Sequence, residues 1–109
     1  IEFKKAVIDS VEGDTILALK QLTPVRLLKN DFYRQIESAE SKGASADELK
    51  AILGRARAKK GMYEGDMKEG ELEIGQVSAL LNDIPKAADI VASVWNDFST
   101  ALANPVNFH

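Results

Sequence analysis

The sequence predicts a mostly helical α+β fold with four to five short amphipathic helices and a small two-stranded sheet. Apolar residues recur at three- and four-residue spacing in several segments, which is the helical period. Two short stretches, residues 15–19 and 71–74, are apolar or alternate in polarity, as strands do. The chain has 109 residues, 45% hydrophobic and 28% charged. This size and composition are typical of one globular unit or part of one.

The first half of the chain predicts a helix, a strand and a second helix. Apolar residues between positions 3 and 11 share one helical face, and Gly13 ends that pattern before the strand at residues 15–19. The Thr-Pro pair at positions 23–24 favours a helix start, because the hydroxyl can cap and proline suits the first turn. Gly43 then closes the helix. Its apolar face comprises Leu27, Leu28, Phe32, Ile36 and Ala39.

A third helix is predicted from Ser45 to the region of Gly61. Ser45 and Glu48 have the spacing of a capping box, in which each side chain bonds the other residue's amide. The apolar stripe of this helix comprises Leu49, Ile52, Leu53 and Ala56, and its other side carries Lys50, Arg57 and Lys60. The basic residues lack the order of a phosphate-binding loop, and we interpret them as a complement to the helix dipole.

Residues 61–81 are the most irregular segment and the one we expect to bear function. Four glycines alternate with acidic side chains between positions 61 and 75, which predicts a loop. Residues 71–74 are expected to pair with residues 15–19 as the small sheet, and residues 76–81 to form a short helix. The acidic cluster lacks the order of a calcium-binding loop and is interpreted as a solvated turn.

The last helix is predicted to start near Asp83 and Pro85 and to end near residues 104–105. It carries the strongest apolar stripe of the chain, comprising Ala87, Ile90, Val91, Val94, Trp95, Phe98 and Leu102. Because Trp95 lies at helical spacing from its apolar neighbours, we expect it to belong to the hydrophobic core.

Charge and residue counts argue against several classes of protein. With 14 basic and 17 acidic residues the net charge is -3, so no nucleic-acid partner is expected. The absence of cysteine excludes disulfides, zinc-thiolate sites and thiol nucleophiles. No apolar run approaches the roughly 20 residues of a membrane helix, and no membrane partner is expected. The start lacks a signal-peptide core and an initiator methionine, so we expect a cytoplasmic protein and a cut chain.

No complete catalytic or metal site is predicted. The lone histidine, His109, is the last residue and cannot be held on a rigid element. No serine lies in a Gly-x-Ser-x-Gly motif. Glu73 is set apart, because it lies between Leu72 and Ile74 and is followed by Gly75, which permits close approach of a ligand or another backbone. Glu73 either lines a pocket or points to solvent from an alternating strand.

Three motifs follow one another along the second half of the chain: GMYEGD at residues 61–66, GELEIGQVSALL at 70–81 and NDIPKAA at 82–88. Together they resemble the C-terminal region of the nitronate monooxygenase (2-nitropropane dioxygenase) family, which includes flavin-dependent enoyl-acyl-carrier-protein reductases. Residues 14–16, 23–26 and 54–55 also have counterparts in family order, so the resemblance spans nearly the whole chain.

The resemblance implies that residues 1–109 are a C-terminal fragment that caps the TIM-barrel of an FMN-dependent oxidoreductase or monooxygenase. The barrel itself is absent. Gly75 and Gln76 would then lie at the FMN. Glu73 would line the substrate pocket, at a position where relatives commonly have a small or apolar residue. A carboxylate beside a flavin would alter the preferred charge of the substrate.

The expected partners are the missing N-terminal barrel of the same protein and a small-molecule substrate, a nitronate or an enoyl thioester. The fragment alone should bind no FMN and be inactive, because it contains no flavin-phosphate cradle. It could self-associate through the surface that normally meets the barrel. The alternative function is a stand-alone helical protein-interaction module without catalysis.

Overall fold

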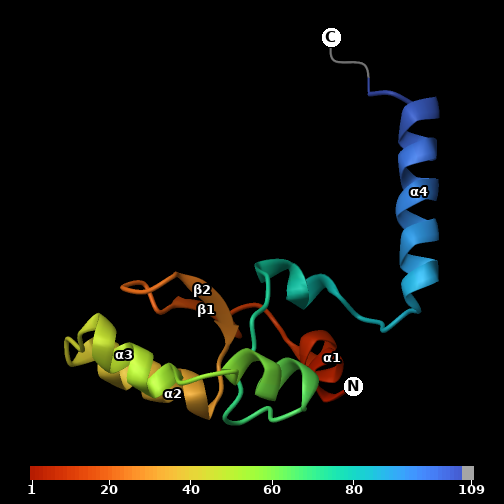
Figure 1. Cartoon of the computed structure of the whole chain (residues 1–109). Coiled ribbons are helices and arrows are strands. Elements are labelled where there is room, and N and C mark those ends of the chain that lie inside the picture. Colours follow the sequence, from red (N-terminus) through yellow and green to blue (C-terminus); the bar gives the residue numbers. More distant parts are fainter. Residues whose placement is uncertain (107–109) are drawn as a thin grey trace.

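The structure is a computed structural model that describes residues 1–106. The elements along this part of the chain are α1 (Glu2–Asp9), β1 (Thr15–Ala18), β2 (Val25–Leu28), α2 (Asp31–Ser41), α3 (Ala46–Leu53), a π-helical turn η1 (Lys59–Tyr63), a 3₁₀ turn η2 (Gln76–Leu80) and α4 (Ala87–Ala103) (Figure 1). The fold is therefore mostly helical with a two-stranded sheet, as the sequence predicts.

The sheet is an antiparallel hairpin of β1 and β2, with Ile16 opposite Leu27. The predicted pairing of residues 15–19 with residues 71–74 was wrong. Residues 71–74 lie along the other edge of β2, where Glu73 forms a single bridge to Leu27. A short connection joins β1 to β2, so this local pairing costs less chain entropy than the distant one.

The predicted helix start at positions 23–24 was also wrong, because this segment leads into β2. α2 begins only after Asn30, whose Oδ1 accepts a hydrogen bond of 2.9 Å from the backbone N–H of Tyr33. Asparagine is among the strongest N-cap residues and ranks above threonine, which favours this later start. Leu27 and Leu28 are buried as predicted, but from a strand.

The core lies where the inner face of the hairpin meets α2 and α3. Its buried members are Ala18, Leu19, Leu27, Phe32, Tyr33, Ile36 and Leu49. Phe32 and Ile36 share one face of α2, and burying each contributes about 1.5–3 kcal/mol. Every member lies before residue 50, so the first half of the chain forms this core.

α3 starts as predicted and ends earlier. The Glu48 carboxylate accepts from the Ser45 amide at 2.7 Å, and the Ser45 hydroxyl accepts from the Glu48 amide at 3.3 Å, so both halves of the capping box form. The expected continuation to residue 60 was wrong. Gly54 adopts a φ of +65°, a left-handed conformation that glycine tolerates, and the helix stops at Leu53.

Arg57 joins the end of α3 to the following loop. Its guanidinium donates to the carbonyls of Ile52 at 2.7 Å and Leu53 at 2.9 Å, and to the carbonyl of Glu69 at 3.0 Å. It also lies 4.7 Å from the centroid of the Phe32 ring. Arg57 was predicted to complement the helix dipole, and it does so by donating hydrogen bonds to the last carbonyls of α3.

Asn30 and a pair of glycines hold residues 61–74 against the helices. The Asn30 amide donates to the carbonyls of Met67 at 3.0 Å and Gly70 at 2.8 Å. A Cβ built on Gly70 would lie 2.2 Å from the Cα of Gly61, so the two backbones are in direct contact. These two glycines therefore serve internal packing.

α4 stands away from the hairpin, α2 and α3 (Figure 1). The expectation that Trp95 belongs to the core was wrong, because Trp95 is 65% exposed and contacts Phe98, itself 54% exposed, at a centroid distance of 5.6 Å. No residue of α4 is buried. Within the described residues, the strongest apolar stripe in the sequence is therefore largely uncovered, and only Ile90 lines a hollow with residues of α1.

The chain exposes more surface than a compact monomer of its size. The accessible surface is 7892 Å², about 1900 Å² more than expected for a compact monomer of 11.9 kDa. The radius of gyration is 17.9 Å, against about 13 Å for a compact chain of this length. Most exposed large apolar side chains lie after residue 76. They belong to η2, to α4 and to residues 81–86, which connect the two.

None of the helices in residues 1–106 combines the length and the apolar character needed to cross a membrane. His109 lies outside the described residues.

Candidate functional site

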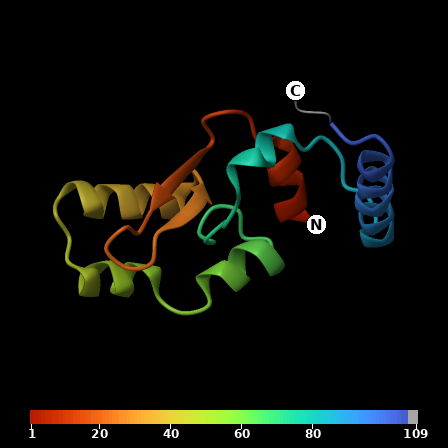
Figure 2. The same cartoon turned by 90° about the horizontal axis from the view of Figure 1, so that it is seen from above.

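The candidate site is a hollow between the outer face of the hairpin and η2. η2 lies beside α1 and the connection that follows it (Figure 2). The hollow has a volume of about 520 Å³ and is lined by Val11, Glu12, Gly13, Thr15, Arg26, Gln76, Val77, Ala79 and Leu80. We call it the η2 hollow. It contains polar groups from the hairpin and apolar side chains from η2.

Arg26 is the cation of the η2 hollow. It lies opposite Leu17 in the register, on the face away from Leu27 and the core. One guanidinium nitrogen donates to the Thr15 hydroxyl at 3.1 Å, and the side chain is half-buried. Among the described residues no carboxylate lies within ion-pair distance of it. Sequence reasoning used Arg26 only as part of a family motif and missed its position, since the hairpin was not predicted.

The three predicted site residues are all exposed, but they do not line one hollow. Gln76 lines the η2 hollow, whereas Glu73 and Gly75 are not part of its lining. Glu73 lies opposite Leu27, and residues paired across strands share a face, so Glu73 is on the side of the sheet opposite Arg26. The cofactor and substrate roles proposed for these residues remain predictions.

Glu71 is a buried carboxyl group that sequence reasoning assigned to a solvated turn. It is only 8% exposed. Burial, followed by the nearby charge of Glu73, raises the pKa of Glu71, and Arg57 partly offsets the rise. The expectation of a wholly solvated acidic turn was wrong at this residue. The neighbouring Leu72 is buried as well, and the Glu71 backbone N–H donates to the Arg57 carbonyl at 3.1 Å.

Asp66 orders the turn that precedes this segment. Its carboxylate accepts from the backbone amides of Lys68 at 3.1 Å and Glu69 at 2.9 Å, and lies 3.3 Å from the Lys60 ammonium. The hydrogen bond from the Glu69 amide is the largest effect, and with Lys60 it lowers the pKa of Asp66. Within the acidic cluster, Asp66 thus fixes the turn by accepting hydrogen bonds from backbone amides.

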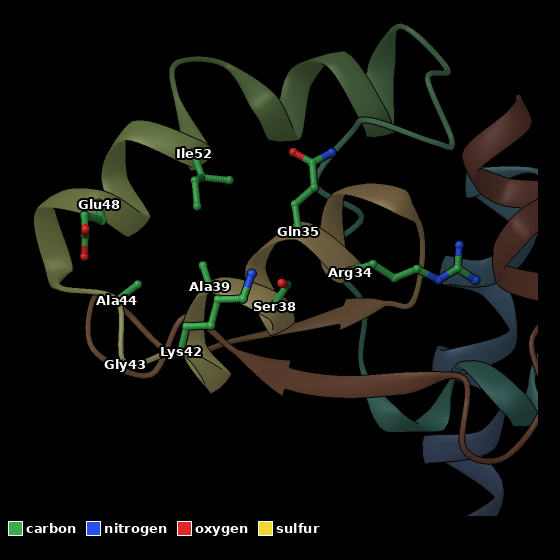
Figure 3. Close-up of a pocket in the computed structure, with 9 residues that line it drawn as sticks. All are labelled: Arg34, Gln35, Ser38, Ala39, Lys42, Gly43, Ala44, Glu48 and Ile52. Atoms are coloured by element: carbon green, nitrogen blue, oxygen red, sulfur yellow. The ribbon is translucent and has the colours of Figure 1, made fainter.

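A broader hollow of about 770 Å³ lies between α2 and α3 (Figure 3). Two of its charged groups are already engaged, because Arg34 pairs with Asp31 at 2.7 Å and Glu48 belongs to the capping box; the third, Lys42, is exposed. Arg34 also points away from the other labelled side chains. The one unengaged cation of this hollow is therefore more open to water than Arg26 in the η2 hollow, and its attraction for an anion is more strongly screened.

The described part of the chain contains no group of three or more His, Asp or Glu side chains that could hold a metal ion. A buried polar group without a partner is the Ser78 hydroxyl, on η2.

These features define the class of structure. A small core formed by the hairpin, α2 and α3 is followed by a loop, η2 and α4, and the apolar side chains of η2 and α4 are largely exposed. The chain is similar to part of the solved structure of FabK from Thermotoga maritima, with a TM-score of 0.77 and 21% identity, covering 94% of this chain and 32% of FabK. The M276A mutant of the same FabK matches with a TM-score of 0.70 and 18% identity, covering 94% of this chain and 30% of the mutant.

The chain therefore spans about a third of the length of these solved structures. At these identities the likeness shows the fold alone. No family model matches the sequence, and no curated protein matches it.

Proposed function

We propose that this chain is the part of an FMN-dependent oxidoreductase that covers the flavin and shapes its substrate pocket. Two observations support this: the ordered motifs of residues 61–88, and the similarity in fold to FabK, an FMN-dependent enoyl-acyl-carrier-protein reductase. The fold similarity favours the enoyl reductase type over the nitronate monooxygenase type. The substrate would then be an enoyl thioester.

Gly75 is the observation that carries this proposal. Of the seven glycines, four have a positive φ, and Gly61 and Gly70 pack backbone to backbone. Gly75 has an ordinary φ of -88°, and a Cβ built on it would meet nothing within 4 Å. Nothing within residues 1–106 requires glycine there, which supports close approach of a group from outside.

The uncovered apolar surface supports a large partner, which we propose is the barrel of the same protein. An excess of about 1900 Å² is more than one partner contributes to a standard protein–protein interface, which is about 800 Å². η2 and α4 contain most of the apolar side chains concerned, and η2 begins directly after Gly75. The face that meets the barrel would thus include the proposed flavin side.

The residues of this chain suit one side of an FMN site only. The open backbone at Gly75 and the exposed Gln76 amide would cover the flavin, and Glu73 would help to line the substrate pocket. Bound FMN supplies hydride transfer. We infer that the barrel holds the phosphate, because the motifs that form phosphate loops are absent from this sequence. The 109-residue chain alone should then bind no FMN.

The test uses the intact gene product and the 109-residue chain in parallel. The gene should encode a (β/α)-barrel upstream of Ile1, and its product should purify with bound flavin, seen by absorbance. Gly75→Val should lower FMN retention or kcat in the intact protein. In the 109-residue chain it should change stability by less than about 0.5 kcal/mol.

Ala51→Val, on the exposed side of α3, is the matched control and should leave flavin and kcat unchanged. A gene without a barrel upstream would refute the proposal, as would an intact Gly75→Val protein with normal flavin content and turnover. Flavin bound to the purified 109-residue chain would contradict the division of the site between the two parts.

A stand-alone interaction module predicts a compact, cooperative monomer. The radius of gyration of 17.9 Å and the unpartnered α4 do not favour that alternative. Sedimentation velocity with a thermal melt separates the two, because an uncovered cap should associate while a module should sediment as one compact species.

A further inference from the structure

We propose that the η2 hollow binds an oxyanion carried on an apolar chain, with the Arg26 guanidinium as the group that recognises the anion. The proposal concerns the hollow itself and does not depend on a flavin in the intact protein. It assigns a ligand class to Arg26 and Thr15, which the proposed flavin cover does not use, together with residues of η2, the turn that also belongs to the face proposed to meet the barrel.

The Arg26 guanidinium is oriented and largely unsatisfied. Its bond of 3.1 Å to the Thr15 hydroxyl fixes the side chain across the hairpin. A guanidinium has five N–H donors in a planar fork, and this is the single bond to another side chain or backbone group that the described residues give it. The fork matches the two oxygens of a carboxylate or phosphate. An oxyanion would use the remaining donors.

Half-burial strengthens the case for an anion. A cation in a hollow is less screened by water than one on an open surface, so its attraction for an opposite charge is greater. The Gln76 amide lines the same hollow and can donate to an oxygen. The neighbouring Glu12 carboxylate opposes anion binding; it is exposed and forms no ion pair with Arg26.

The rest of the lining specifies an apolar chain. Val77 is 64% exposed and Leu80 is 80% exposed, and Val11 faces the same hollow at 63% exposure. Covering such side chains with an apolar group removes them from water, which is favourable in free energy. The volume of about 520 Å³ lies within the range of small-molecule sites, so it admits a ligand with an anionic head and a short apolar chain.

The experiment titrates the ¹⁵N-labelled 109-residue chain with octanoate, octyl phosphate and the neutral analogue octanamide. Amide shifts at Thr15, Arg26 and Gln76 report on the hollow, and shifts along α4 report on non-specific apolar binding. We expect the two anions to bind the hollow about tenfold or more tightly than octanamide, as a charge-assisted hydrogen bond does relative to a neutral one. Octanoate and octyl phosphate together distinguish a carboxylate from a phosphate preference.

Arg26→Met should abolish the preference for the anions, whereas Arg55→Met should retain it. Arg55 is exposed and does not line the hollow, so it controls for net charge. Glu12→Gln should strengthen anion binding by removing a like charge. If Arg26→Met fails to fold, the comparison of octanoate with octanamide on the unsubstituted chain still decides the question. Equal affinities for the three probes, or anion-dependent shifts confined to α4, would overturn the proposal.

Discussion

Replacing Gly70 by alanine should destabilise the chain far more than the same replacement at Gly75. A Cβ at position 70 would lie 2.2 Å from the Gly61 Cα, 2.5 Å from the Asp66 carbonyl oxygen and 2.6 Å from the Gly61 nitrogen. All three atoms belong to the backbone, so no side-chain rotation can relieve the contact. The loop must move away from η1.

The size of the effect follows from what that movement breaks. Inserting a methyl group into a packed site costs about 1–3 kcal/mol, and more where the backbone must shift. The Gly70 N–H donates to Asp66 at 3.0 Å, and the Gly70 carbonyl accepts from Asn30 at 2.8 Å. Losing these bonds adds about 1 kcal/mol each. We expect a loss of about 3–5 kcal/mol, against a total of about 5–15 kcal/mol for a domain of this size.

Urea unfolding followed by circular dichroism measures the difference, at a protein concentration held constant for all variants. Gly75→Ala is the matched control, because both variants carry the same change in the conformational freedom of the unfolded chain. It should lie within about 0.5 kcal/mol of the unsubstituted chain or be slightly more stable. A Gly70→Ala midpoint equal to that of Gly75→Ala would refute the reasoning about backbone contact.

Four further variants test other contacts, with unfolding free energy as the readout for the first three. Asn30→Ala should lose about 3 kcal/mol, since it removes an N-cap and two further hydrogen bonds. Ser78→Ala should be stabilising or neutral, because the buried hydroxyl has no partner. The pKa of Glu71 is raised in the folded chain, so ionisation of Glu71 lowers the free energy of unfolding. This loss disappears as the pH falls toward the ordinary pKa of glutamate. Glu71→Gln should therefore stabilise the chain at pH 7 and lose that advantage near about pH 3, whereas a constant difference at both pH values would exclude this origin. Trp95→Glu combined with Phe98→Glu should leave core stability unchanged and reduce self-association in sedimentation velocity, because both side chains are mostly exposed.

Features that depend on neighbouring residues could be predicted from the sequence. The capping box of Ser45 and Glu48 forms because both partners lie within one turn. Gly43, with a φ of +76°, follows the end of α2 as predicted. The position of α4 was also predicted, since its apolar period is long and unbroken.

Contacts between distant segments were predicted poorly. Residues 25–28 were predicted as part of a helix, so residues 71–74 were the one other strand that the sequence offered to β1. The η2 hollow was missed for the same reason, because Arg26 lines it from the outer face of the hairpin, which was not predicted. Glu71 was assigned to solvent because its neighbours are acidic, whereas in the folded chain it is buried next to Leu72.

The sequence by itself determined the helical character of the chain, the capping box at the start of α3 and the segment where function is expected. Local hydrogen bonds and side-chain periodicity control those properties. The tertiary structure decided which strands pair, which carboxyl group is buried and which apolar stripe has no partner. Trp95 shows the reason: apolar spacing indicates that a helix face must be covered, but the surface that covers it depends on residues elsewhere, and none of those described here does so.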